Sequence, residues 1–263
     1  MTGAALAATS ILVTRPGDQA DNLCRLICEQ QGTAINWPAI RIAPRDPDTA
    51  TTHALANATP DDIVIFVSRN AVRNGARFIP REAPPMITTV GPSTAAELES
   101  TGLSVDMVPY GHDSESLLGQ LDEIDVTGRQ VFIMRGTGGR ETLRRGLEDR
   151  GASVDYVEVY ERECPRVPTE EVSDVIHRWT ASEHRLFTAT SIEILENLLT
   201  MLGPDNIGIL RDAAMVTASR RVVQRADSFG HCGDRLLAPG PDDSSLLNAM
   251  IDWRNGIAAA ESP

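Results

Sequence analysis

The feature that most constrains the fold is an internal repeat with an offset of about 120 to 130 residues. Three pairs of segments match in the same order: residues 13–15 with 133–135, 65–68 with 186–189, and 113–118 with 243–247. A shared order at a nearly constant offset predicts two structurally related halves.

Each half alternates short apolar runs with amphipathic stretches. The first apolar run, 11–14, precedes an amphipathic stretch at 19–31, which ends at Gly32, and a second apolar run at 34–37. This β-α-β order favours parallel sheets covered by helices. Further strands are expected at 63–67, 86–90, 105–108, 130–134 and 154–160. Asp113 and Ser114 are expected to cap a helix, and the tail 254–263 is expected to fray.

The repeat also predicts how the halves are divided along the chain. The first strand and helix belong with the C-terminal material, so one domain comprises residues 1–38 and 166–263, and the other, 45–157, is inserted in it. Residues 39–44 and 158–165 are expected to pair as a two-stranded linker. The predicted fold class is α/β, with two similar parallel-sheet, three-layer domains of the flavodoxin or Rossmann type facing each other across a ligand cleft.

Charge and hydrophobicity exclude several classes of partner. The chain has 37 acidic and 24 basic side chains and a net charge of -13, which argues against nucleic-acid binding. No apolar run is long enough to span a membrane, and the small, apolar N-terminus lacks the basic start of a signal peptide. We therefore expect a cytoplasmic protein with no membrane partner, and we expect a monomer.

The cysteines and histidines do not form a metal-binding pattern. The four cysteines include no C-x-x-C pair, and the five histidines have no H-x-x-x-H spacing. We expect reduced thiols and no metal. The glycines at 136–139 fit neither a Walker loop nor G-x-G-x-x-G, and no G-x-S-x-G elbow is present. No cofactor is expected.

Six turns should meet at the carboxyl ends of the predicted strands, where open α/β sheets bind ligands. They span residues 14–16, 68–70, 91–94, 135–140, 188–191 and 217–220, and each precedes a helix whose free N–H groups favour anions. The alternative is that these residues are ordinary N-caps and surface charges. The candidate substrate-binding residues are Thr14, Arg15, Ser68, Asn70, Gly91, Thr94, Arg135, Gly138, Gly139, Arg140, Thr188, Ser191 and Ser219.

An ordered set of motifs resembles the uroporphyrinogen-III synthase family over about residues 11–251. The motifs are I-L-V-T-R-P at 11–16, F-V-S-R-N-A-V at 66–72, V-G-P-S-T-A at 90–95, S-E-S-L-L at 114–118, G-G-R-E-x-L at 138–143 and V-Y-E-R at 159–162. The resemblance implies two α/β domains joined by a two-stranded ladder, in agreement with the topology drawn from the repeat.

The resemblance also implies a cofactor-free cyclising lyase of tetrapyrrole biosynthesis. Its substrate is the linear polycarboxylate hydroxymethylbilane, which loses water and closes to uroporphyrinogen III with inversion of the last ring. Orientation matters more than acid-base chemistry in such a reaction. By resemblance, Tyr160 is the catalytic residue that assists departure of the hydroxyl group. The alternative reading of Tyr160 is a residue that packs the hinge.

Two other functions fit the same topology. One is a non-catalytic two-domain protein that closes on an anionic metabolite. The other is a sugar-phosphate or nucleotide-phosphate transferase, against which the missing phosphate loop and metal-binding carboxylates count.

Overall fold

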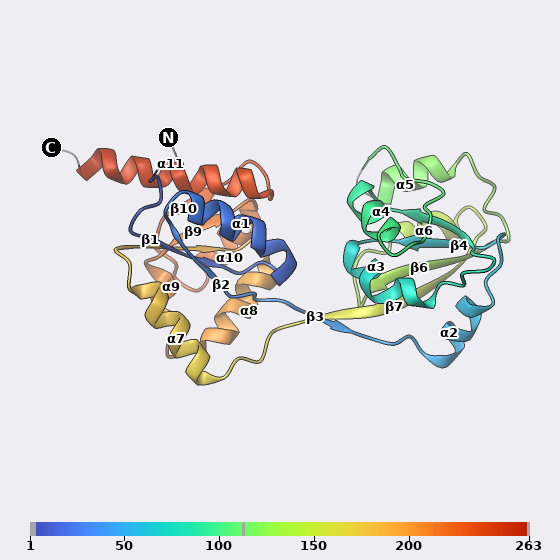
Figure 1. The fold of residues 1–263 in the computed structure, drawn as a ribbon, viewed down its shortest axis with the longest axis horizontal. Coiled ribbons are helices and arrows are strands. Elements are labelled where there is room, and N and C mark those ends of the chain that lie inside the picture. Colours follow the sequence, from blue (N-terminus) through green and yellow to red (C-terminus); the bar gives the residue numbers. More distant parts are fainter. Residues whose placement is uncertain (1–3, 112–113, 262–263) are drawn as a thin grey trace. The chain divides into compact units, whose positions relative to one another are not determined.

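The computed structural model describes residues 4–111 and 114–261. The chain divides into two compact units: unit 1 comprises Met1–Arg41 and Glu163–Pro263, and unit 2 comprises Ile42–Arg162. Unit 2 thus interrupts unit 1 in the sequence. Each unit contains a sheet of mostly parallel strands flanked by helices (Figure 1). The α/β fold class predicted from the repeat is confirmed.

The elements of unit 1 come from both ends of the chain. Its strands are β1 (Thr9–Val13), β2 (Thr33–Asn36), β8 (His184–Thr188), β9 (Ala214–Thr217) and β10 (Arg235–Leu237). Its helices are α1 (Gly17–Glu29), α7 (Thr169–Thr180), α8 (Ile192–Leu202), α9 (Gly208–Arg211), α10 (Arg220–Asp227) and α11 (Asp243–Glu261). The sheet order among the described residues is β10-β9-β8-β1-β2, with every paired strand parallel to its neighbour.

Strand β1 is buried along its whole length because helices cover both faces of the sheet. On one face, Ile11 packs in a cluster with Leu23 of α1 and Leu246 of α11. On the other, Trp179 of α7 donates its indole N–H to the carbonyl oxygens of Ser10, at 3.2 Å, and Leu186, at 3.0 Å. The core of unit 1 therefore joins segments that lie far apart in the sequence.

Unit 2 is contiguous, although the first residue of β3 and the last residue of β7 belong to unit 1. Its strands are β3 (Arg41–Pro44), β4 (Ile63–Phe66), β5 (Met86–Thr89), β6 (Gln130–Gly136) and β7 (Ser153–Glu163). Its helices are α2 (Thr49–Ala56), α3 (Arg69–Gly75), the 3-10 helix η1 (Ala76–Phe78), α4 (Pro92–Glu99), α5 (Ser114–Leu121) and α6 (Thr142–Glu148). The sheet order among the described residues is β3-β7-β6-β4-β5.

Alternation along β4 builds the two core layers of unit 2. Val64 and Phe66 belong to a cluster with Val72 of α3, whereas Ile63 and Ile65 belong to a second cluster that includes residues of α5 and α6. Side chains of successive strand residues point to opposite faces, so a wholly apolar strand needs helices on both sides. The result is a three-layer arrangement (Figure 1).

The chain crosses between the units within β3 and near the end of β7. The Arg45 N–H donates to the Val159 carbonyl oxygen at 2.9 Å, and Arg41 forms an ion pair with Glu163, so the two strands run in opposite directions. The assignment of residues 39–44 and 158–165 as a linker between domains 1–38 plus 166–263 and 45–157 stays a prediction.

Two local expectations were wrong. Residues 105–108 form only a single bridge, between Met107 and Thr88. The Asp106 N–H donates to the Ile87 carbonyl at 2.8 Å, and two side-chain bonds supplement it: the Asp106 carboxylate accepts from the Ile87 N–H at 2.7 Å, and Thr88 Oγ1 donates to the Met107 carbonyl at 2.9 Å. The tail also differs, because α11 continues to Glu261. The expected cap Asp113 lies outside the described residues.

Candidate functional site

A pocket of about 260 Å³ opens at the carboxyl ends of β4, β6 and β7 in unit 2. This is the edge at which open parallel sheets bind ligands. Its lining comprises Val67, Ser68, Ile133, Arg135, Gly136, Thr137, Gly138, Gly139, Arg140, Leu143, Tyr156, Tyr160 and Arg162. These described lining residues include three arginines and no carboxylate, so the pocket favours an anionic ligand.

A β-bulge places Tyr160 in this pocket. Arg135 pairs with Glu158, but the next residue, Gly136, pairs with Tyr160, so Val159 is the extra residue on β7. A Cβ atom on Gly136 would lie 2.6 Å from two atoms of the Tyr160 ring, closer than real contacts allow. The bulge and the glycine together make room for the tyrosine ring, which is only 6% exposed.

The Tyr160 hydroxyl lies 3.2 Å from Ser68 Oγ, and either group can donate in this hydrogen bond. Ser68 is the N-cap of α3, and its Oγ accepts from the Ala71 N–H at 3.1 Å. When Ser68 donates its own proton to Tyr160, the phenolic O–H is left to donate to a ligand. The geometry therefore provides a fixed hydroxyl pair on the pocket wall.

Tyr156 forms a second aromatic wall. Its hydroxyl donates to Glu141 Oε2 at 3.0 Å, and the guanidinium groups of Arg135 and Arg144 lie 4.2 and 5.0 Å from its ring centre. Burial and then the hydrogen bond to Glu141 raise the pKa of Tyr156, so the phenol stays protonated. Tyr156 is thus a neutral surface against which cations stack.

The positive charge nearest solvent comes from Arg140 and Arg162, both exposed. The Glu158 carboxylate of β7 lies 3.4 Å from Arg45 Nη1 and also accepts from the Gly138 N–H at 3.3 Å. Cations at the rim of a pocket raise the local concentration of anionic ligands even in an acidic protein.

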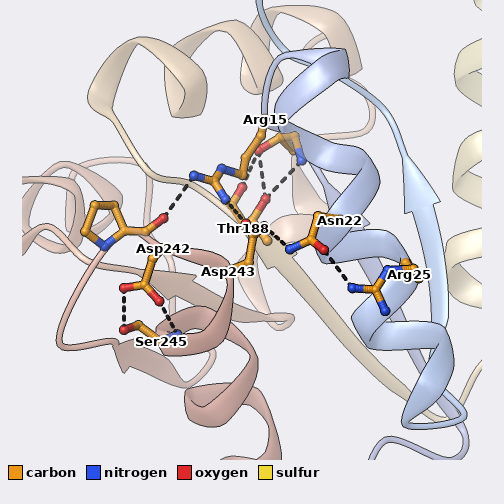
Figure 2. Close-up of polar contacts among 9 residues, drawn as sticks. Arg15, Asn22, Arg25, Thr188, Asp242, Asp243 and Ser245 are labelled. Atoms are coloured by element: carbon orange, nitrogen blue, oxygen red, sulfur yellow. Dashed lines mark hydrogen bonds and ion pairs between the residues drawn. The ribbon is translucent and has the colours of Figure 1, made fainter. Parts of the chain in front are cut away.

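In unit 1, the turns at the same sheet edge are bonded to one another. Thr14 and Thr188 are fully buried, and the Thr14 N–H donates to Thr188 Oγ1 at 2.9 Å. Thr14 Oγ1 in turn donates to the Thr188 carbonyl oxygen at 2.5 Å. These bonds hold the ends of β1 and β8 together (Figure 2).

Arg15 likewise bonds to partners within unit 1. One of its guanidinium nitrogens pairs with Asp243, and the other donates to the Pro241 carbonyl oxygen at 2.9 Å. Asn22 Nδ2 donates to the second oxygen of Asp243 at 2.6 Å. Figure 2 shows that Asp243, at the start of α11, lies between Arg15 and Asn22. The cluster fastens α11 to the turn that precedes α1.

Residues 21–248 match the sequence model of a family described as uroporphyrinogen-III synthase HemD. The chain belongs to this family. It is 27% identical to uroporphyrinogen-III synthase of Escherichia coli K12 and 28% identical to that of Salmonella typhimurium LT2. Both alignments cover 92% of this chain and 99% of the relative.

Solved structures of the family share the fold. Uroporphyrinogen-III synthetase from Helicobacter pylori 26695 superposes with a TM-score of 0.59 at 14% identity, over 95% of this chain and 99% of the other. A mutant uroporphyrinogen III synthase from the extremely thermophilic bacterium Thermus thermophilus gives 0.52 at 16% identity, over 96% and 100%. At these identities the likeness shows the fold.

The pocket brings together part of the predicted site. Six predicted residues of unit 2 line it: Ser68, Arg135, Gly138, Gly139, Arg140 and Tyr160. Three others in unit 2 are outside that lining. Asn70 lies half-buried in the first turn of α3, while Gly91 is the N-cap of α4 and Thr94 is buried in its first turn.

The remaining unit 1 residues open helices, as expected of N-caps. Ser191 Oγ accepts from the Ile194 N–H at 3.1 Å at the start of α8. Ser219 opens α10, but its side chain makes no capping bond, and its N–H donates to Thr217 Oγ1 at 3.1 Å. Substrate binding by Thr14, Arg15, Thr188, Ser191 and Ser219 stays a prediction.

Sequence reasoning missed several residues that shape these sites. Tyr156, Glu141 and Gly136 shape the pocket, and Asp243 holds Arg15. The repeat marked Asp243 only as part of a matching segment. No signal in the sequence indicated the bulge that sets Gly136 opposite Tyr160.

No metal-binding cluster of three or more histidine, cysteine or acidic side chains occurs within the described residues. All four cysteines are free thiols. Among the helices of the described chain, none is long and apolar enough to cross a membrane.

Proposed function

We propose that this chain is a uroporphyrinogen-III synthase, a cyclising lyase that converts hydroxymethylbilane into uroporphyrinogen III. The match of residues 21–248 to the family carries the proposal. Its relatives from two enteric bacteria bear that name and align along 99% of their length. The arginine-lined pocket supports the same conclusion, because the substrate is a polycarboxylate.

Binding is proposed to begin with the substrate's carboxylates. Arg140 and Arg162 stand exposed at the pocket, and the glycines at 138 and 139 leave backbone close to a ligand. Carboxylates held at fixed points restrict a flexible linear tetrapyrrole to few conformations. Such restriction lowers the entropic part of the barrier to ring closure.

Tyr160 is proposed to assist the departure of the substrate's hydroxyl group. Its O–H, freed by the bond that Ser68 can donate, would hydrogen-bond to the leaving oxygen. The C–O bond breaks and the hydroxyl group leaves as water with one added proton. Inversion then exchanges one C–C bond: the freed methylene carbon bonds to the carbon of the last ring that carries the bridge to its neighbour, and that bridge bond breaks. The bridge carbon bonds again to the other, unsubstituted α-carbon of the last ring, which loses one proton, so the reaction consumes no net acid or base.

The assay follows from the two possible products. Hydroxymethylbilane closes spontaneously without inversion to isomer I, so the purified protein should be incubated with freshly prepared substrate and both isomers separated chromatographically. We expect isomer III in excess. Isomer I alone, at the rate of the protein-free reaction, would reject the proposal in favour of a binding protein without catalysis.

Replacing Tyr160 with Phe tests its proposed role. The variant keeps the ring that packs against Gly136 and removes the hydroxyl that bonds Ser68. We expect kcat for isomer III to fall about tenfold or more, with an unfolding midpoint close to that of the wild type. An unchanged kcat would assign Tyr160 to packing.

We propose in addition a cytoplasmic monomer that binds no nucleic acid, in which residues 39–44 and 158–165 link the two domains. The net charge of -13 supports the absence of a nucleic-acid partner. Sedimentation at micromolar concentration tests the monomer, since a dimer would double the mass.

A further inference from the structure

Arg135 is a buried cation that faces its own loop. Its side chain is only 8% exposed, although it is the penultimate residue of β6 and lines the pocket. The guanidinium donates to the carbonyl oxygens of Gly136, at 3.2 Å, Gly138, and Arg140, at 3.4 Å. The nearest carboxylate, Glu141, lies 3.8 Å away. The charge is therefore directed at the backbone of residues 136–140.

The loop and the guanidinium fit each other closely. Gly139 has a φ of +112°, a conformation that side-chain-bearing residues rarely adopt, and a Cβ atom there would overlap Arg135 Nη2. On its other side the guanidinium stacks on Tyr156, 4.2 Å from the ring centre. The loop can close over Arg135 only because residue 139 is glycine.

Planar trans peptides determine where the loop's N–H groups point. The carbonyl and N–H of one peptide point in opposite directions. Because the Gly138 carbonyl accepts from Arg135, the Gly139 N–H points away from the guanidinium. This N–H has no acceptor within residues 4–111 and 114–261. The Thr137 N–H, by contrast, is bound to the Tyr160 carbonyl oxygen at 2.9 Å, which anchors the loop to β7.

We propose that Arg135 is a positioning residue for substrate binding. It holds the loop 136–140 so that the Gly139 N–H and the Arg140 side chain are presented to a substrate carboxylate, and it does not contact that carboxylate itself. The inference rests on the proposed function and gives Arg135 an indirect part in binding.

The internal repeat supplies a natural comparison. Arg15 occupies the position in unit 1 that Arg135 occupies in unit 2. Its guanidinium, however, forms an ion pair with Asp243 and donates a hydrogen bond to the Pro241 carbonyl oxygen. Pro16 follows Arg15, whereas Gly136 follows Arg135. Of these two arginines, it is Arg135 that holds carbonyl oxygens of the turn directly after it, and we expect the loop contact with substrate to be made by unit 2.

Three variants test the assignment: Arg135→Gln, Arg135→Lys and Gly139→Ala. For each, kcat and KM for isomer III are measured, together with the inhibition constant of the product and the unfolding midpoint. We expect R135Q to raise KM and the product inhibition constant about tenfold, because a tenfold weaker binding corresponds to the free energy of one lost charge-assisted hydrogen bond. The kcat of R135Q should stay within about twofold of the wild-type value. R135K should be intermediate, and G139A should resemble R135Q because it displaces the same guanidinium.

Arg145→Gln is the matched control. Arg145 is exposed on α6 in the same unit, so its loss changes the charge equally and should leave KM and kcat unaltered. The proposal would be overturned if R135Q had an unchanged KM and its kcat fell only in proportion to the folded fraction. Arg135 would then have a purely structural role. If the wild type makes no isomer III, the proposed function fails instead, which is a separate result.

Discussion

Replacing Gly136 with Ala tests whether the exact position of the Tyr160 ring matters for catalysis. The added Cβ would lie 2.6 Å from two ring atoms, and ordinary contact begins at 3.4 Å. The ring must therefore move by about 0.8 Å, and with it the hydroxyl that bonds Ser68 at 3.2 Å. Displacements near 1 Å can cost about a hundredfold in rate.

We expect kcat for isomer III to fall by about tenfold to a hundredfold in G136A, and the free energy of unfolding to fall by about 1–3 kcal/mol from overpacking. The assays are initial-rate chromatography of both isomers and urea denaturation. Gly119→Ala is the control: it lies in α5, no atom stands within 4 Å of its added Cβ, and the change should stabilise the helix slightly without affecting kcat.

A double variant shows whether the effect passes through the tyrosine hydroxyl. If it does, adding Gly136→Ala to Tyr160→Phe should slow the reaction little further, because the group being displaced is already gone. A wild-type kcat in G136A, or fully additive losses in the double variant, would refute the reasoning.

Two further predictions concern unit 1. Asp243→Asn should lower the free energy of unfolding by about 1–2 kcal/mol in urea denaturation, because Arg15 loses its partly buried partner. The control is Asp252→Asn: Asp252 is exposed on the same helix, and its replacement should have no measurable effect. Burial lowers the pKa of His231 from its usual 6.5, so the folded protein resists protonation as the pH falls through 6.5 while the unfolded chain takes up the proton. The contribution of His231 to the free energy of unfolding is therefore fully present above that pH and declines below it. In denaturation experiments from about pH 7.5 to 5.5, the free energy of unfolding should fall less in His231→Gln than in the wild type.

The sequence predicted the fold better than it predicted the contacts within the site. The repeat indicated two parallel α/β sheets because apolar periodicity follows directly from burial on both faces. The strand pattern also indicated that the turn after Arg135 belongs to a ligand-binding site, because the loops at the carboxyl ends of parallel strands lie at the same edge of the sheet. The direction of the guanidinium was not predictable, because three carbonyl oxygens of its own loop determine it.

Other differences have equally local causes. Residues 105–108 have the composition of a strand, but a single bridge forms, and side-chain bonds accepted by Asp106 and donated by Thr88 make up most of the contact with β5. The pairing of Arg15 with Asp243 joins residues 228 positions apart, which no local pattern encodes. The bulge at Val159 changes register by one residue, a shift that alternation of apolar and polar residues does not reveal.

The division of unit 1 into two segments has a consequence for biosynthesis. Strand β1 emerges from the ribosome early, but β8, which pairs with it, begins at His184. At about 5–20 residues per second, β1 waits on the order of ten seconds or more for this neighbour. The contiguous unit 2, which ends at Arg162, is synthesised entirely within that interval. Throughout that interval β1 can pair with β2, but its opposite edge, which β8 covers in the folded unit, stays open to contact with other strands.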